Sequence, residues 1–138
     1  MKSAGRQLDR DISAALARQE KLGRLRARIR RLLLKWEQRL GVSVQSWQVK
    51  DAKDYWATMD DHEIWFAADL SDMPAAFVEV IVVHELVHQL TKGHDPEFFA
   101  LMDCHLPGWR RIHARYDKVP ALYSNAVMKR TLTRRMAV

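Results

Sequence analysis

Apolar residues recur at helical spacing through the first third of the chain. Between Asp9 and Leu40 they return every three or four residues, which is the period of an amphipathic α-helix. These positions are Ile12, Leu16, Leu22, Leu25, Ile29, Leu32, Leu33, Trp36 and Leu40. The pattern predicts a long N-terminal helix that buries this face and ends at Gly41, with Gly23 as a point where it could bend or break.

The next thirty residues change to the alternating pattern of strands. Segments at 42–49, 55–59 and 63–70 alternate or are β-rich, and short polar turns separate them. Short strands joined by short turns pair most simply as hairpins. The sequence therefore predicts a small, mainly antiparallel three-stranded sheet.

Apolar residues then occupy nearly every position from Ala75 to Leu90. A helix that is apolar on all sides is buried, so this segment is predicted to be the central helix. Shorter helices are predicted at 95–104, at 109–116 and in the basic tail at 121–138. The predicted fold class is α+β, with a small antiparallel-rich sheet packed on the central helix and a long N-terminal helix before it.

The central helix carries an HExxH pattern. His84 and His88 are four residues apart, which puts both imidazoles on one helix face. Two imidazoles so placed can bind one divalent metal ion, and Glu85 between them can hold the metal's water. A catalytic zinc needs a third protein ligand, and His94 is the candidate because Gly93 can turn the chain back. The alternative is a buried helix whose histidines are satisfied by ordinary hydrogen bonds.

Composition sets broad limits on the kind of protein. With 138 residues and 48% hydrophobic content, we expect one globular domain over 1–138. It would comprise a basic helical region at 1–40, the sheet and metal-binding helices at 42–118, and a basic tail at 119–138. No apolar run is long enough to span a membrane, and the N-terminus does not resemble a signal peptide. The single cysteine, Cys104, fits a reducing cytoplasm.

Charge is distributed unevenly along the chain. Residues 1–40 contain 12 Lys and Arg against 4 Asp and Glu, residues 41–104 contain 3 against 12, and residues 105–138 contain 8 against 1. The acidic middle section lowers the cost of bringing a divalent cation to the motif. The basic ends could bind nucleic acid non-specifically or only solvate exposed helix faces. In the first helix the basic positions opposite the apolar face are Arg24, Arg26, Arg28, Arg30, Arg31 and Lys35.

Several segments in combination resemble one known family. They are His84–His88, the later His94, Asp95–Phe99 and Leu106–Arg110. Together they resemble the YgjP-like metallopeptidases, which are small zincins related to the SprT-like and WLM proteases. The likeness is specific over about residues 80–111 and weaker over the preceding helix and strands.

The resemblance implies a zincin-like fold and zinc-dependent hydrolysis of peptides or proteins. In the family, the two motif histidines and the later histidine bind zinc and the glutamate is the catalytic base. These roles carry over here to His84, His88 and His94 as ligands and to Glu85 as the base. The family also has a strand signature of the type Lys-x-Arg-Trp-Gly-Ser-Cys, and the segment 53–59 matches it only at its lysine and its tryptophan.

Other interpretations stay open beside this one. The histidine spacing also matches metzincins, although these have glycine where Thr91 stands. The basic ends favour a nucleic-acid-associated SprT-like protease or binding protein. The departures around Trp56 favour a zinc-stapled structural domain without turnover. We further expect an extended substrate to pair with the strand Glu63–Leu70. The sequence does not identify the residue that stabilises an oxyanion. His113, Tyr116 and Tyr123 are candidates, and for each the alternative is packing or surface exposure.

Overall fold

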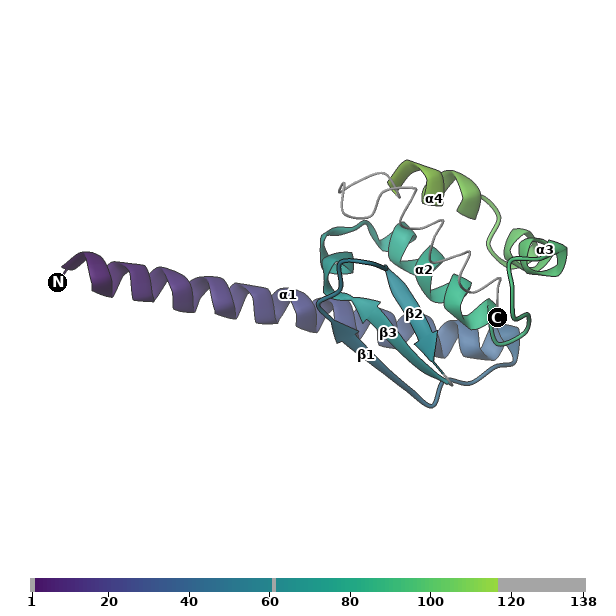
Figure 1. Cartoon of the computed structure of the whole chain (residues 1–138), viewed down its shortest axis with the longest axis horizontal. Coiled ribbons are helices and arrows are strands. Elements are labelled where there is room, and N and C mark those ends of the chain that lie inside the picture. The colour runs from purple at the N-terminus through teal and green to yellow at the C-terminus, as the bar shows by residue number, and fades with distance from the viewer. Residues whose placement is uncertain (1, 61, 117–138) are drawn as a thin grey trace.

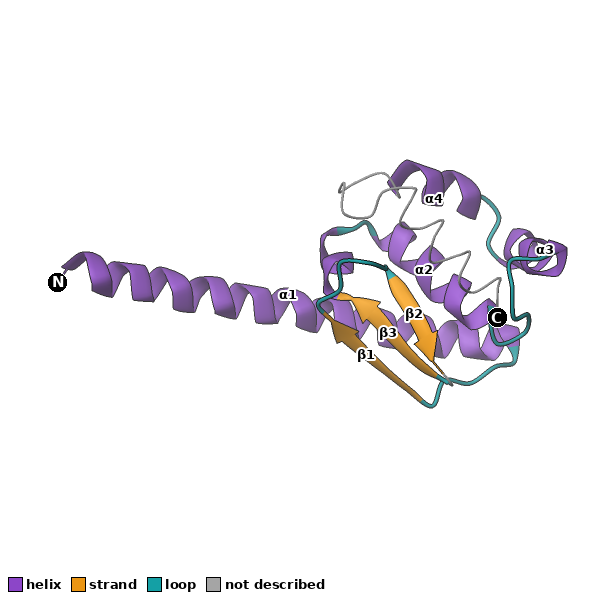
Figure 2. Cartoon of the chain, in the orientation of Figure 1, coloured by secondary structure: helices purple, strands orange, loops and turns teal. Residues whose placement is uncertain are grey.

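The computed structural model describes residues 2–60 and 62–116. Its elements are α1 (Lys2–Leu40), β1 (Ser46–Lys50), β2 (Ala57–Asp60), β3 (Glu63–Ala67), the 3-10 helix η1 (Ala68–Asp72), α2 (Ala75–Val87), α3 (Pro96–His105) and α4 (Trp109–Tyr116). Within these residues the fold is α+β, with four α-helices and a small mixed sheet (Figure 2). The predicted tail at 119–138 lies outside the described residues.

The helix α1 is continuous over 39 residues and does not break at Gly23. Its C-terminal half packs on α2 and buries Leu25, Ile29, Leu33, Trp36 and Leu40. It ends at Gly41, which adopts a left-handed φ of 69° and donates its N–H to the carbonyl of Glu37. The predicted helix and its glycine C-cap are therefore present, although the helix begins earlier than Asp9.

The N-terminal half of α1 extends away from the other described elements (Figure 1). Leu8, Ile12 and Leu16 on this part are at least half exposed. Their helical spacing continues that of the core residues, so the sequence pattern alone gives no sign of where the covered part of the helix begins. Although α1 is long, it is too polar to cross a bilayer, and no other helix of the described residues combines the length and apolarity to do so.

The sheet is mixed, and its strand order is β1-β3-β2. β3 pairs antiparallel with β2 and parallel with β1. The predicted antiparallel sheet of hairpins is therefore right for β2 and β3 and wrong for β1. The physical reason is burial: Ile64, Phe66 and Ala67 of β3 are fully buried, whereas β1 alternates between exposed and half-buried positions. The most apolar strand takes the centre and the more polar strands take the edges.

The central position of β3 corrects a second expectation. The sequence predicts that the segment Glu63–Leu70 offers its edge to a substrate. In the structure β3 is paired on both sides, and the end of the segment, from Ala68 to Leu70, belongs to η1. A strand with both edges used cannot add another strand. β2 lies at the edge of the described sheet that contacts α2.

The helix α2 lies in the middle of the core, with ten buried residues from Phe77 to Val87. It ends three residues before the predicted Leu90, and its N-cap is Pro74 without a side-chain hydrogen bond. The polar exception in its first half, Glu79, accepts hydrogen bonds from Trp36 Nε1 at 2.9 Å and Lys35 Nζ at 3.0 Å. Burial alone would raise the pKa of Glu79, but these bonds outweigh it and hold the pKa below its ordinary value. Glu79 therefore ties α2 to α1.

Candidate metal centre

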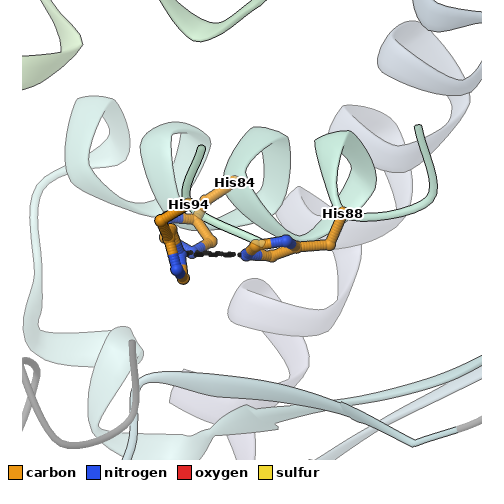
Figure 3. A group of neighbouring side chains, drawn as sticks. All are labelled: His84, His88 and His94. Atoms are coloured by element: carbon orange, nitrogen blue, oxygen red, sulfur yellow. Dashed lines mark hydrogen bonds between the residues drawn. The ribbon is translucent and has the colours of Figure 1, made fainter. Parts of the chain in front are cut away.

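Three imidazole rings converge where α2 ends. His84 lies in the last turn of α2, His88 is its C-cap residue, and His94 lies in the loop before α3. Their Nε2 atoms are 3.1 Å apart in each of the three pairs. Figure 3 shows the three rings turned toward one another. His84 and His94 are only 6% exposed, and His88 is half-buried. Among residues 2–60 and 62–116, this is the group of side chains arranged to hold a metal ion.

The turn after α2 explains how the third histidine comes back to the first two. The N–H groups of Leu90 and Thr91 both bond to the carbonyl of Val87, so the chain tightens as the helix ends. Thr91 is buried, and its carbonyl oxygen lies 3.3 Å from Nδ1 of His88. When this Nδ1–H donates to the carbonyl, Nε2 keeps its lone pair for a metal. The predicted reversal between His88 and His94 is therefore observed, and within it the hydroxyl of Thr91 donates to the carbonyl of Gly93 at 3.3 Å.

Phe98, on α3, contacts the rings of all three histidines. Its ring centroid lies 5.0 Å from that of His84, 4.9 Å from that of His88 and 4.6 Å from that of His94. Phe98 is 1% exposed, and its N–H donates to the side chain of Asp95, the N-cap residue of α3, at 2.9 Å. The sequence pattern marks Phe98 only as an apolar helix position. Its contact with the histidines depends on the angle of α3, for which no local signal exists.

The donor set fits a divalent metal better than it fits hydrogen bonding alone. A neutral imidazole nitrogen either donates or accepts, so three mutual Nε2 contacts cannot all be hydrogen bonds. A tetrahedral zinc with Zn–N bonds of about 2.0–2.1 Å keeps its nitrogen ligands about 3.3 Å apart, close to the spacing seen here. The three histidines therefore have the chemistry and the spacing to hold a divalent metal ion such as zinc. Glu85, the predicted base, follows His84 on α2 and is 3% exposed.

Two other residues of α3 whose side chains could bind a metal, Asp103 and His105, are engaged elsewhere. Asp103 accepts hydrogen bonds from Arg110 and Trp109, which hold the pKa of Asp103 below its ordinary value. The ring of His105 lies against that of Trp36, with 6.5 Å between centroids. Neither belongs to the histidine cluster.

Two of the three residues proposed to stabilise an oxyanion lie near the other end of α2. His113 and Tyr116 on α4 have ring centroids 6.3 Å and 6.0 Å from that of Phe77. Phe77 precedes His84 by seven residues, which is about 10 Å along a helix axis. Burial lowers the pKa of His113, as expected for an imidazole packed against the rings of Phe77 and Trp109. The third, Tyr123, lies outside the described residues.

Two histidines one helical turn apart, with a glutamate between them and a third histidine beyond, form a set of zinc ligands that metallopeptidases use. The family model for the YgjP-like metallopeptidase domain matches residues 4–118. The match covers most of the chain, and the chain belongs to this family, as the resemblance predicted. No curated protein and no solved structure matches it.

Proposed function

We propose that this chain is a zinc-dependent metallopeptidase whose metal is held by His84, His88 and His94. The observation that carries the proposal is the mutual 3.1 Å spacing of the three Nε2 atoms. Membership of a metallopeptidase family supports the same chemistry. The packing around the site is then zincin-like, with the HExxH segment on the buried helix α2.

Each residue of the motif has a defined role in this proposal. When bound, zinc supplies a Lewis acid that polarises the scissile carbonyl and lowers the pKa of a water molecule to about 7. Glu85 accepts the proton of the attacking water and passes it to the leaving amine. Burial of Glu85 keeps its carboxylate away from bulk water, so the proton stays on the reaction path. Phe98 and the His88–Thr91 hydrogen bond hold the imidazoles in place.

In this proposal the strand that pairs with the substrate is β2, and not β3 as the sequence predicts. β2 is an edge strand of the described sheet and contacts α2, so an extended peptide along it would run beside the helix that carries the site. Main-chain pairing would supply affinity, and side chains of β2 would select residues of the substrate.

The substitution Glu85→Gln tests the proposal. It removes the base and leaves the three imidazoles, so zinc content measured by mass spectrometry should match that of the wild type. Hydrolysis of an unfolded protein substrate should fall about 10²–10⁴-fold. Equal hydrolysis by the two proteins would contradict the role of Glu85.

A second candidate is a zinc-stapled structural domain without turnover. The observation in its favour is the segment Tyr55–Met59, which keeps only the tryptophan of the family's strand signature. This alternative predicts that the wild type binds zinc but hydrolyses nothing, so the same experiment separates the two functions.

A further inference from the structure

We infer that the protein binds single-stranded nucleic acid in a hollow between α1 and β1. The hollow has a volume of about 420 Å³ and is lined by Arg26, Arg30, Trp47, Gln48 and Val49. It combines two guanidinium groups with an aromatic ring at the surface. This inference does not depend on the proposed hydrolytic activity.

The two arginines face β1 because of their positions on α1. At 100° per residue, Arg26 and Arg30 lie close together on one side of the helix. Arg28, Arg31 and Lys35 lie on the other side and line a separate groove beside the first turn of α2. These basic residues of α1 therefore form two rows. Lys35 of the second row lies over the ring of Trp36, but Trp36 is buried, whereas Trp47 beside the first row is half-buried.

The charges in the hollow are not neutralised within the described structure. Neither Arg26 nor Arg30 makes an ion pair with a carboxylate of residues 2–60 or 62–116, and both are exposed. Three other basic residues of α1 do pair with carboxylates: Arg18, Lys21 and Lys35. Exposed guanidinium groups without such partners are suited to bind phosphate, which they can contact with two hydrogen bonds.

Trp47 is the feature that favours a single strand over other polyanions. Its ring is half-buried, held edge-on by Phe66 at 6.2 Å, and lies 6.0 Å from the guanidinium carbon of Arg30. That last distance is the outer limit of a cation–π contact, so the guanidinium is not closely stacked on the indole. An unpaired base can stack on such a ring, whereas bases in a duplex stack on one another.

The hollow lies at the opposite edge of the sheet from β2. β3 separates β1 from β2, and β2 is the strand that contacts α2. A strand of nucleic acid at β1 would therefore leave the histidine centre accessible. The bound nucleic acid would anchor the protein and would not be its substrate.

Fluorescence anisotropy with a labelled random single-stranded oligonucleotide tests the inference on the full chain. Each neutralised phosphate contributes a slope of about −0.7 to the dependence of log affinity on log salt. Two phosphate contacts therefore predict about a sevenfold loss of affinity between about 50 and 200 mM salt. The double substitution Arg26→Gln/Arg30→Gln should remove this loss and weaken binding at the lower salt.

Two further variants separate a site from a general charge effect. Arg28→Gln/Arg31→Gln removes the same charge from the other row, so it should weaken binding less than the first double variant. Trp47→Leu leaves the charge unchanged and should weaken binding at least about fivefold, since one base stacked on an aromatic ring contributes that much or more. Trp47→Phe should restore most of the affinity, because it restores a stacking surface.

Several results would overturn the inference. Equal losses from the two double variants would mean that binding is spread over α1, and an unchanged Trp47→Leu variant would mean that no base stacks there. Binding to vesicles of anionic lipid without binding to the oligonucleotide would assign the surface to membranes. No binding at the lower salt would remove the site.

Discussion

Replacing Phe98 with leucine should weaken metal binding without removing any ligand. The ring of Phe98 lies within 5.0 Å, between centroids, of all three histidine rings and stacks on that of His88 at an interplanar angle of 20°. Leucine keeps most of the volume but not the flat surface that sets the ring planes. Loss of a group that orients metal ligands typically costs about 10–100-fold in affinity. We expect a loss in that range.

The same substitution also costs stability, so a control must separate the two effects. Phe77 is as buried as Phe98 but contacts Trp56, His113 and Tyr116 instead of the three ligands. Phe77→Leu and Phe98→Leu should each cost about 1–2 kcal/mol in the metal-free protein, because each is a partial truncation in the core. Only the second should change the affinity for zinc.

Competition with a chromophoric chelator measures the zinc affinity, and thermal unfolding of the metal-free proteins measures the stability. A cobalt-substituted protein adds a direct report, because its visible spectrum depends on ligand geometry. If both variants lost the same affinity, the effect would be one of general stability. If neither lost any, the ring of Phe98 would have no part in orienting the histidines.

Three other predictions concern the metal, the pH and the backbone. His94→Ala should lose tight zinc binding, and a chelator should lower the melting temperature of the wild type by about 10 °C but leave that of the variant unchanged, since bound zinc at 100 times its dissociation constant stabilises by about 2.7 kcal/mol. Glu79→Gln should destabilise the protein at pH 7, because the pKa of Glu79 is lowered in the folded state. Stability from a lowered carboxyl pKa is present above the unfolded value of 4.5 and is lost as the pH falls through the folded value, so urea unfolding should show the two proteins converging below pH 4.5. Gly23→Ala should stabilise the protein by about 0.5–1 kcal/mol, because alanine favours the helix interior. Gly41→Ala should destabilise it by about 1 kcal/mol, because Gly41 has a positive φ. Neither added methyl group meets an atom within 4 Å, so unfolding curves should report the effect on the backbone alone.

The histidine cluster could be predicted because its members are close in the sequence. His84 and His88 are one helical turn apart, and only five residues separate His88 from His94. A helix period and one chain reversal are enough to bring such residues together. The contact of Phe98 could not be predicted in the same way, since it depends on how α3 docks against α2.

For a similar reason, local sequence patterns could not predict the order of the strands in the sheet or how much of α1 is covered. Alternation predicts each strand but not its neighbour. The central place of β3, which pairs with both β1 and β2, depends on how the completed core packs. The apolar spacing of α1 predicts a buried face along its whole length, yet Ile12 and Leu16 are exposed where the helix extends past the other described elements. The period of the apolar residues predicts which face of the helix is apolar. Only the tertiary arrangement decides how much of that face is covered.

The departures from the family's strand signature lie on both sides of Trp56, at Tyr55 and at 57–59, and their positions limit what they can change. Trp56 is 1% exposed and packs edge-on against Phe77 at 5.2 Å between ring centroids, so it joins β2 to the first half of α2 whatever the chemistry at the other end. Thr58 and Met59, which stand where the family has serine and cysteine, are half-buried on β2. None of these residues belongs to the histidine cluster. In the proposed function, the departures therefore bear on what a substrate would meet along β2 and not on how a metal is held. A wild-type protein that binds zinc through the three histidines but hydrolyses nothing would accordingly place the defect in β2, and restoring the serine and cysteine at positions 58 and 59 would be the substitution to make.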